Sequence, residues 1–225
     1  MKKALALLVL IATPSIIFAQ GTVGFANQTG LVQRWTSAYD STLAPVPKGG
    51  GYVQLIATTK GNPLLHALGV YDGCSGFLPG YSSLAGFLFA NPGWEVPTGV
   101  DGGVNPGPIG LGPGFFSNGK AWIGNIADGA SADYMLIGWT GPYATYDAAY
   151  AADLANPNSS FLGMSAIATT ATGSTSVTLP GGPVSLRPTF PGMTLAPAVI
   201  PEPTTVLMAG VGAVMVLLLR RRGYY

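Results

Sequence analysis

The stretch Tyr52-Val53-Gln54-Leu55-Ile56-Ala57-Thr58 is a short, mainly apolar run between a cluster of glycines and a Gly-Asn-Pro turn signal. Runs bounded in this way are typical of β-strands between turns. Further strands are predicted near Thr22–Ala26, Val32–Ser37, Leu64–Tyr71, Leu84–Ala90, Lys120–Ile126, Tyr134–Trp139, Ser165–Thr170, Ser174–Leu179 and Met193–Ala198. Many short strands with few helix-forming stretches predict a mainly β fold, an antiparallel β-sandwich of jelly-roll or Greek-key type.

One short helix is predicted over residues 145–155, which are rich in alanine and end before Asn156-Pro157. Tyr146, Tyr150 and Leu154 fall on one face of this helix at a spacing of four residues. A stripe of this kind packs on a sheet, so we expect it to belong to the core.

The segment from Asn91 to Gly119 is rich in Gly and Pro, and it is predicted to be a long loop. Loops of this length are uncommon in compact domains unless they are functional or mobile. Trp94 in this loop is therefore the candidate ligand contact. Tryptophans in loops more often anchor their own loop to the core, which is the competing interpretation of Trp94.

Composition indicates one folded, exported body of about 180 residues once the terminal signals are set aside. Only 8% of the 225 residues are charged and 48% are hydrophobic, with four Trp, ten Tyr and nine Phe. Disordered chains have the opposite composition, so we expect residues 20–198 to fold. This body carries five scattered Lys and Arg against eight Asp and Glu, which excludes the basic stripe that nucleic-acid binding requires.

Residues 1–19 are predicted to be a secretory signal peptide. Two lysines precede a short apolar core, Pro14 follows it, and Ala19 is a small residue at the cleavage point before Gln20. The core is short for a membrane span, although an uncleaved anchor is the alternative. Cleavage after Ala19 would make Gln20 the mature N-terminus.

Residues 199–225 have three parts in sequence. The tripeptide Pro201-Glu202-Pro203 precedes an apolar run that ends at Leu219, and three arginines, Arg220, Arg221 and Arg222, follow. A helix over 204–219 would rise roughly 24 Å, slightly less than a ~30 Å hydrocarbon core. We expect a transmembrane helix with the arginines in the cytoplasm and the body outside.

This tripartite tail resembles the PEP-CTERM sorting signal of Gram-negative bacteria, part by part over about the last 25 residues. The resemblance implies recognition by an exosortase, a membrane-embedded enzyme that is thought to cut near the tripeptide and pass the body to the cell surface. It also implies an inner-membrane precursor and an association with exopolysaccharide. The same tail has been labelled an ice-binding-protein C-terminal domain.

A search for catalytic chemistry gives little. Asp128 and Asp133 are the nearest acidic pair, but Asp-Gly at 128–129 is a turn signal. His66 is the single histidine and Cys74 the single cysteine. Cys74 therefore makes no internal disulfide; we expect it to be buried, with an intermolecular bridge as the alternative. We expect no cofactor, no metal site and no enzymatic activity.

The sequence thus predicts a non-enzymatic cell-surface or matrix protein that associates with extracellular polysaccharide. One alternative is a carbohydrate-binding module in which Trp94 stacks on a sugar ring. A secreted glycoside hydrolase with two aspartates is another. Ice binding comes last, because the Thr-rich stretch at 169–178 lacks regular spacing.

Overall fold

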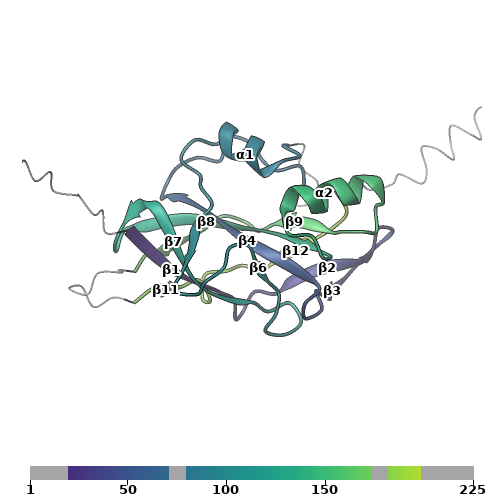
Figure 1. Ribbon diagram of the computed structural model, residues 1–225, viewed down its shortest axis with the longest axis horizontal. Coiled ribbons are helices and arrows are strands. Elements are labelled where there is room, and N and C mark those ends of the chain that lie inside the picture. The colour runs from purple at the N-terminus through teal and green to yellow at the C-terminus, as the bar shows by residue number, and fades with distance from the viewer. Residues whose placement is uncertain (1–19, 71–79, 174–181, 199–225) are drawn as a thin grey trace, which may run out of the picture.

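The computed structural model describes residues 20–70, 80–173 and 182–198 (Figure 1). These residues are mainly β, with 45% in strands that form several sheets and 11% in helices. The predicted signal helix, the predicted strand at 174–179, the predicted transmembrane helix at 204–219 and Cys74 all lie outside these residues.

A central sheet is built on two long neighbouring strands, β4 (Gly51–Thr59) and β8 (Ser131–Thr140). They pair antiparallel from Gly51↔Thr140 to Thr59↔Ala132. The sheet is extended by β10 (Ala168–Ala171), β6 (Gly107–Pro108) and β9 (Leu162–Met164). Because side chains alternate along a strand, each long strand serves two cores.

The first core lies between the central sheet and two others. One has the order β11-β1-β7-β5, with β11 at Val184–Ser185, β1 at Gln20–Ala26, β7 at Ser117–Ala127 and β5 at Thr98–Val100. The other has the order β12-β2-β3, with β12 at Met193–Leu195, β2 at Val32–Ser37 and β3 at Asp40–Pro45. Val53 and Leu55 of β4 are fully buried here against Val23 and Phe25 of β1.

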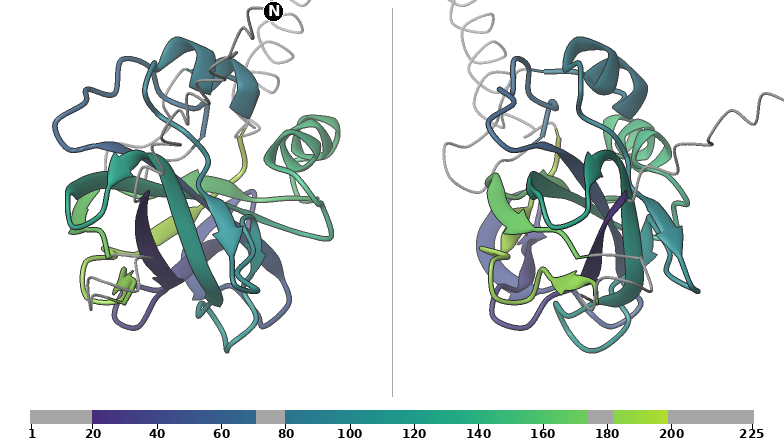
Figure 2. Two further views of the ribbon diagram at one scale, coloured as in Figure 1. Left: turned by 60° about the vertical axis from the view of Figure 1, so that its left-hand side comes forward. Right: turned by 90° about the vertical axis from the view of Figure 1, so that its left-hand side faces the viewer.

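The second core lies on the opposite face of the central sheet, under a layer of two helices, α1 (Leu84–Ala90) and α2 (Tyr146–Ala155). Figure 2 shows both helices on the same side of the sheets. Trp139 of β8 meets Tyr146 of α2 edge to face, with ring centroids 6.5 Å apart. Phe87 of α1 is fully buried in the same cluster.

Five predicted strands are confirmed within a few residues, as β1, β2, β4, β7 and β8. The prediction of a strand at Leu84–Ala90 is wrong, because this segment is α1. The Ser83 hydroxyl caps it by accepting a hydrogen bond from the Gly86 N–H at 3.1 Å. The strand predicted at 64–71 is also wrong for its described part, which forms a loop.

Two further expectations are corrected. The strand predicted at 165–170 is shorter and shifted, to β10, and the strand predicted at 193–198 begins as expected but ends at Leu195, as β12. The sheets are not purely antiparallel, since β11 pairs with β1 and β12 pairs with β2 in parallel. The mainly β prediction is confirmed at the coarser level, and the described part of the body contains two helices in place of the one expected.

The predicted helix over residues 145–155 is confirmed as α2, with the Thr145 hydroxyl capping its first turn. Its inward face differs from the predicted stripe. Tyr146, Ala149 and Asp153 are buried, whereas Leu154 is 53% exposed. Tyr146 and, in part, Tyr150 of the predicted stripe do pack in the second core, together with Ala149 and a buried carboxylate in the last turn.

The segment at 91–119 was predicted to be a structureless loop, and this is also wrong in part, because it contains β5, β6 and the start of β7. Asn105 takes the place of a strand residue beside β4. Its Oδ1 accepts from the Leu55 N–H at 2.8 Å, and its Nδ2 donates to the Leu55 carbonyl at 3.0 Å. A side-chain amide can satisfy backbone groups in this way without any apolar alternation in the sequence.

Candidate functional site

The last described residues of the chain are held firmly to the body. The backbone of Ala196 exchanges two hydrogen bonds with Leu162, at 2.8 and 3.0 Å. Two residues later, the N–H of Ala198 donates a hydrogen bond at 2.6 Å to Oδ2 of Asp153, which lies in the last turn of α2. Hydrogen bonds to the body therefore extend to Ala198, the residue that precedes the predicted sorting tail.

The N-terminal end of the body is also paired from its first described residue. β1 begins at Gln20, the predicted first residue of the mature protein, and Gln20 already pairs with Ala127 of β7. Val23 and Phe25 follow as fully buried residues. The predicted cleavage point thus lies directly before β1.

Trp94, the candidate ligand contact, lies in the second core and is only 4% exposed. Its Nε1 donates to the Pro63 carbonyl at 3.3 Å. The neighbouring Glu95 pairs with Ala57 of β4 through two backbone hydrogen bonds, at 2.9 and 3.0 Å. This position agrees with the anchoring interpretation and leaves little of the ring for stacking on a ligand.

The acidic pair considered for hydrolysis is divided between two roles. Asp133 is on β8, and both its oxygens are engaged. Oδ1 accepts from the Thr169 hydroxyl at 2.6 Å, and Oδ2 accepts from the Gly61 N–H at 2.7 Å. Asp128 lies in the turn between β7 and β8, where Gly129 has a φ of 74° that favours glycine.

His66 is exposed in the loop before α1, and its ring meets the edge of Tyr81 at 5.8 Å between centroids. The backbone around it is held by Asn91, the C-cap of α1. Within residues 20–70, 80–173 and 182–198, no three His, Cys, Asp or Glu side chains gather in a way that could hold a metal ion.

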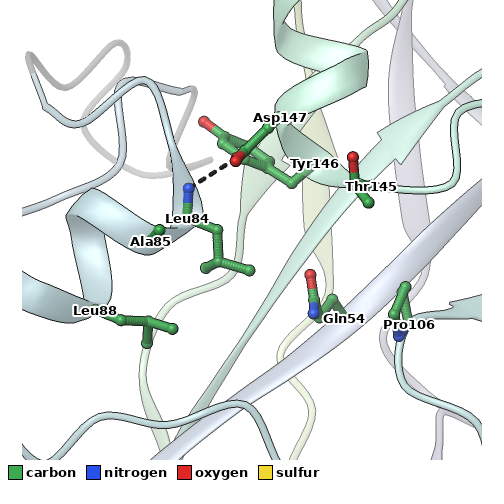
Figure 3. A pocket seen from close by; sticks show the side chains of 8 residues that line it. All are labelled: Gln54, Leu84, Ala85, Leu88, Pro106, Thr145, Tyr146 and Asp147. Carbon is green, nitrogen blue, oxygen red and sulfur yellow. Dashed lines mark hydrogen bonds between the residues drawn. The ribbon is translucent and has the colours of Figure 1, made fainter.

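A pocket of about 300 Å³ opens between the two helices and β4 (Figure 3). Its walls come from four distant parts of the sequence. Leu84, Ala85 and Leu88 belong to α1, Tyr146 and Asp147 to α2, Gln54 to β4, and Thr145 and Pro106 to the adjoining turns. Most of this lining is apolar, and no Lys, Arg or His lines it.

Gln54 is the polar group at the base of the pocket. It lies between Tyr52 and Ile56 on the face of β4 that turns to the helices, and it is 7% exposed. Its carboxamide makes no hydrogen bond with any residue of the described chain. Figure 3 shows this side chain between Leu88 and Pro106.

Two residues of α2 form the polar side of the same pocket. Oδ1 of Asp147 accepts from the Leu84 N–H at 2.8 Å, which joins the first turns of the two helices (Figure 3). The Tyr146 hydroxyl is buried without a hydrogen-bond partner. Burial, and then the nearby Tyr150 and Asp147, raise the pKa of Tyr146 far above its ordinary value. The phenol therefore stays protonated and can act only as a neutral group at physiological pH.

Sequence reasoning missed this pocket, since its lining residues are far apart along the chain. One local signal was present: Gln54 is the lone carboxamide in an otherwise apolar run that is buried on both faces. Such a residue marks a position where packing alone does not explain the side chain.

Comparison with known protein families identifies the C-terminal tail. A family model described as the PEP-CTERM protein-sorting motif matches residues 199–222, beginning directly after Ala198. No curated protein and no solved structure matches the chain. A mainly β body that is followed at once by this motif defines an exported protein with a C-terminal sorting signal. The chain thus carries a PEP-CTERM sorting signal at residues 199–222.

The motif indicates that the protein is exported through a membrane-anchored precursor and sorted by an exosortase, a membrane enzyme. The tripeptide Pro201-Glu202-Pro203 and the arginines at 220–222 fall inside the matched range. Among the described residues there is no helix with the length and hydropathy of a membrane span.

Proposed function

We propose that the sorted body is a non-enzymatic cell-surface or matrix protein that associates with exopolysaccharide. The observation that carries the proposal is the sorting motif at residues 199–222, which follows a hydrogen-bonded body whose contacts reach Ala198. The polysaccharide partner is what the resemblance to other proteins with this tail implies.

The use of carboxylates in the fold supports a non-enzymatic role. A glycoside hydrolase needs two carboxyl groups facing one another across a cleft, free to exchange protons. Here most acidic side chains of the described body accept hydrogen bonds from backbone N–H groups, from hydroxyls or from a lysine. They are Asp40, Glu95, Asp101, Asp133, Asp147 and Asp153. Carboxylates committed in this way hold turns and helices in place.

The remaining parts of the proposal concern architecture and topology. The packing of β4 and β8 against β1 and β7 supports a sandwich of jelly-roll or Greek-key type. We assign residues 1–19 to a cleaved signal peptide, 20–198 to the exported domain and 199–225 to the sorting signal. The helix at 204–219 would hold the precursor in the inner membrane, with Arg220–Arg222 on the cytoplasmic side.

The test is an array of immobilised bacterial polysaccharides probed with the exported protein, together with turnover assays on chromogenic glycosides. The proposal predicts retention on one or more polymers and no turnover. Asp133→Asn is the matched variant, since it keeps an acceptor oxygen and should retain the binding. Turnover that disappears in Asp133→Asn would establish the hydrolase alternative in place of this proposal.

A carbohydrate-binding module is the second candidate function, and one observation favours it. The pocket between α1 and α2 offers apolar walls with a carboxamide, a carboxylate and a hydroxyl around them. Sugar rings present both apolar C–H faces and hydroxyl groups, which suit such a lining. The contact would then lie in this pocket and not at Trp94.

A further inference from the structure

The carboxamide of Gln54 needs an explanation, because it is placed where an apolar side chain would be expected. Its neighbours on the same face of β4, Tyr52 and Ile56, pack in the second core. Its amide atoms are not sealed from solvent like the Tyr146 hydroxyl, and the opening that they face is the pocket. Buried polar groups of this kind in native proteins usually have a partner such as a water molecule or a ligand. Gln54 is nine-tenths buried and borders the pocket.

The lining restricts the chemistry of the partner. No cationic side chain lines the pocket, and Asp147 at its edge would repel an anion. A primary carboxamide carries both a donor and an acceptor, so it complements a group that also carries both. A secondary amide meets this requirement with two reciprocal hydrogen bonds. A methyl group next to that amide would find apolar contacts on Leu84, Leu88 and Pro106.

We infer that the pocket between α1 and α2 binds the acetamido group of an N-acetylated sugar, with Gln54 paired to its amide. The sugar ring lies toward the mouth, where the Asp147 carboxylate accepts hydrogen bonds from its hydroxyl groups. This inference rests on the proposed association with polysaccharide and names the sugar type that the pocket selects. A terminal or side-chain sugar is required, because the walls enclose the group on three sides: α1, α2 and β4.

The experiment uses the full-length exported precursor in lipid nanodiscs and saturation-transfer NMR of small probes. The probes are methyl N-acetyl-β-glucosaminide, methyl β-glucoside and N-methylacetamide. The N-acetylated glycoside should bind about tenfold more tightly than the glucoside, since a good pair of hydrogen bonds in a buried site is worth roughly 1.4 kcal/mol or more. Saturation should be strongest at the acetyl methyl group. N-methylacetamide separates recognition of the amide alone from recognition of the sugar.

Two variants test the residues. Gln54→Met keeps the length of the side chain and removes both hydrogen bonds, so affinity for the N-acetylated glycoside should fall about tenfold. The protein should fold at least as well, since an unpaired amide is lost. Leu88→Trp fills the pocket and should abolish binding. Gln33→Met in β2, on a different sheet, is the matched control and should bind like the wild type.

Three results would overturn the inference: equal affinity for the two glycosides, unchanged affinity in Gln54→Met, or no binding of any probe, which would mean that solvent fills the pocket. The polysaccharide array separates this failure from failure of the proposed function. Retention on the array by Gln54→Met, with no glycoside binding, removes the pocket site and leaves the surface function. Glycoside binding by the wild type with no polymer retained on the array would support the pocket site and remove the proposed polysaccharide association.

Discussion

Asn91 is the residue whose replacement tests the helical layer most sharply. It is fully buried at the C-cap of α1. Its Oδ1 accepts from the N–H groups of Leu65 at 2.8 Å and His66 at 2.9 Å. Its Nδ2 donates to the carbonyls of His66 and Phe87, both at 2.9 Å. One side chain thus ties the loop before α1 to the end of the helix, and it fixes the wall of the pocket.

The size of the effect follows from these four bonds. At about 1 kcal/mol each, Asn91→Ala should lower the free energy of unfolding by about 3–4 kcal/mol, somewhat less where water reaches the exposed loop. Asn91→Asp keeps the acceptor but loses both donors and places a carboxylate against two carbonyls. We expect a loss of about 2–3 kcal/mol. Both are large against a total stability of roughly 5–15 kcal/mol.

The assay is equilibrium denaturation of the exported protein in urea, with hydrogen exchange of the Leu65 and His66 amides as a local readout. Asn156→Ala is the matched control, because Asn156 is exposed and its side chain makes one long contact, 3.4 Å to the Asn158 N–H. It should cost less than about 0.5 kcal/mol. If Asn91→Ala behaved like this control and the two amides kept their protection, the role given to Asn91 would be refuted.

Three further predictions concern charge and export. Hydrogen bonds from Thr36 and then Thr42 lower the pKa of Asp40 from 3.8 to about 2, so its contribution to stability is complete above pH 3.8 and is lost as the pH falls through about 2. An NMR titration should show this midpoint, and Thr36→Val should move it upward; an unshifted midpoint would count against the contact. N-terminal sequencing should begin at Gln20 or within about two residues of it, whereas recovery of the intact initiator methionine would refute cleavage. Replacing the arginines at 220–222 by glutamate should let the tail slip into the periplasm, so fractionation should find the precursor secreted or degraded; normal anchoring would contradict their role.

The long strands and α2 could be predicted from sequence because their signals are local. β4 and β8 are mainly apolar runs between turn residues, β7 alternates between buried and exposed residues, and α2 is an alanine-rich segment that ends before Asn156-Pro157. The segment at Leu84–Ala90 could not be assigned in this way, because a seven-residue apolar run fits a buried strand as well as a buried helix. The caps at Ser83 and Asn91 stabilise the helix over the strand. Asn91 also bonds to Leu65 and His66, which are 26 and 25 positions away in sequence.

The sorting tail and the pocket are opposite cases. Tripeptide, apolar run and arginines are contiguous in sequence, so the tail was predicted in full from residues 199–225, and the match at 199–222 confirms the motif. The pocket combines β4, α1, Pro106 and the start of α2, and only folding brings them together. For Trp94 the sequence left two interpretations open, and the hydrogen bond to Pro63 and the packing in the second core favour the anchoring one.

Processing at the tripeptide is the most direct test of the central claim, that this body is delivered to the surface by an exosortase. The double variant Pro201→Ala with Pro203→Ala leaves the apolar run and the arginines unchanged, and it leaves the Asp153 contact to Ala198 in place. Fractionation with intact-mass measurement should find this variant full-length in the inner membrane, while the wild type is shortened and at the surface. A double variant that is shortened and reaches the surface like the wild type would contradict the claim and reduce the tail to a plain anchor.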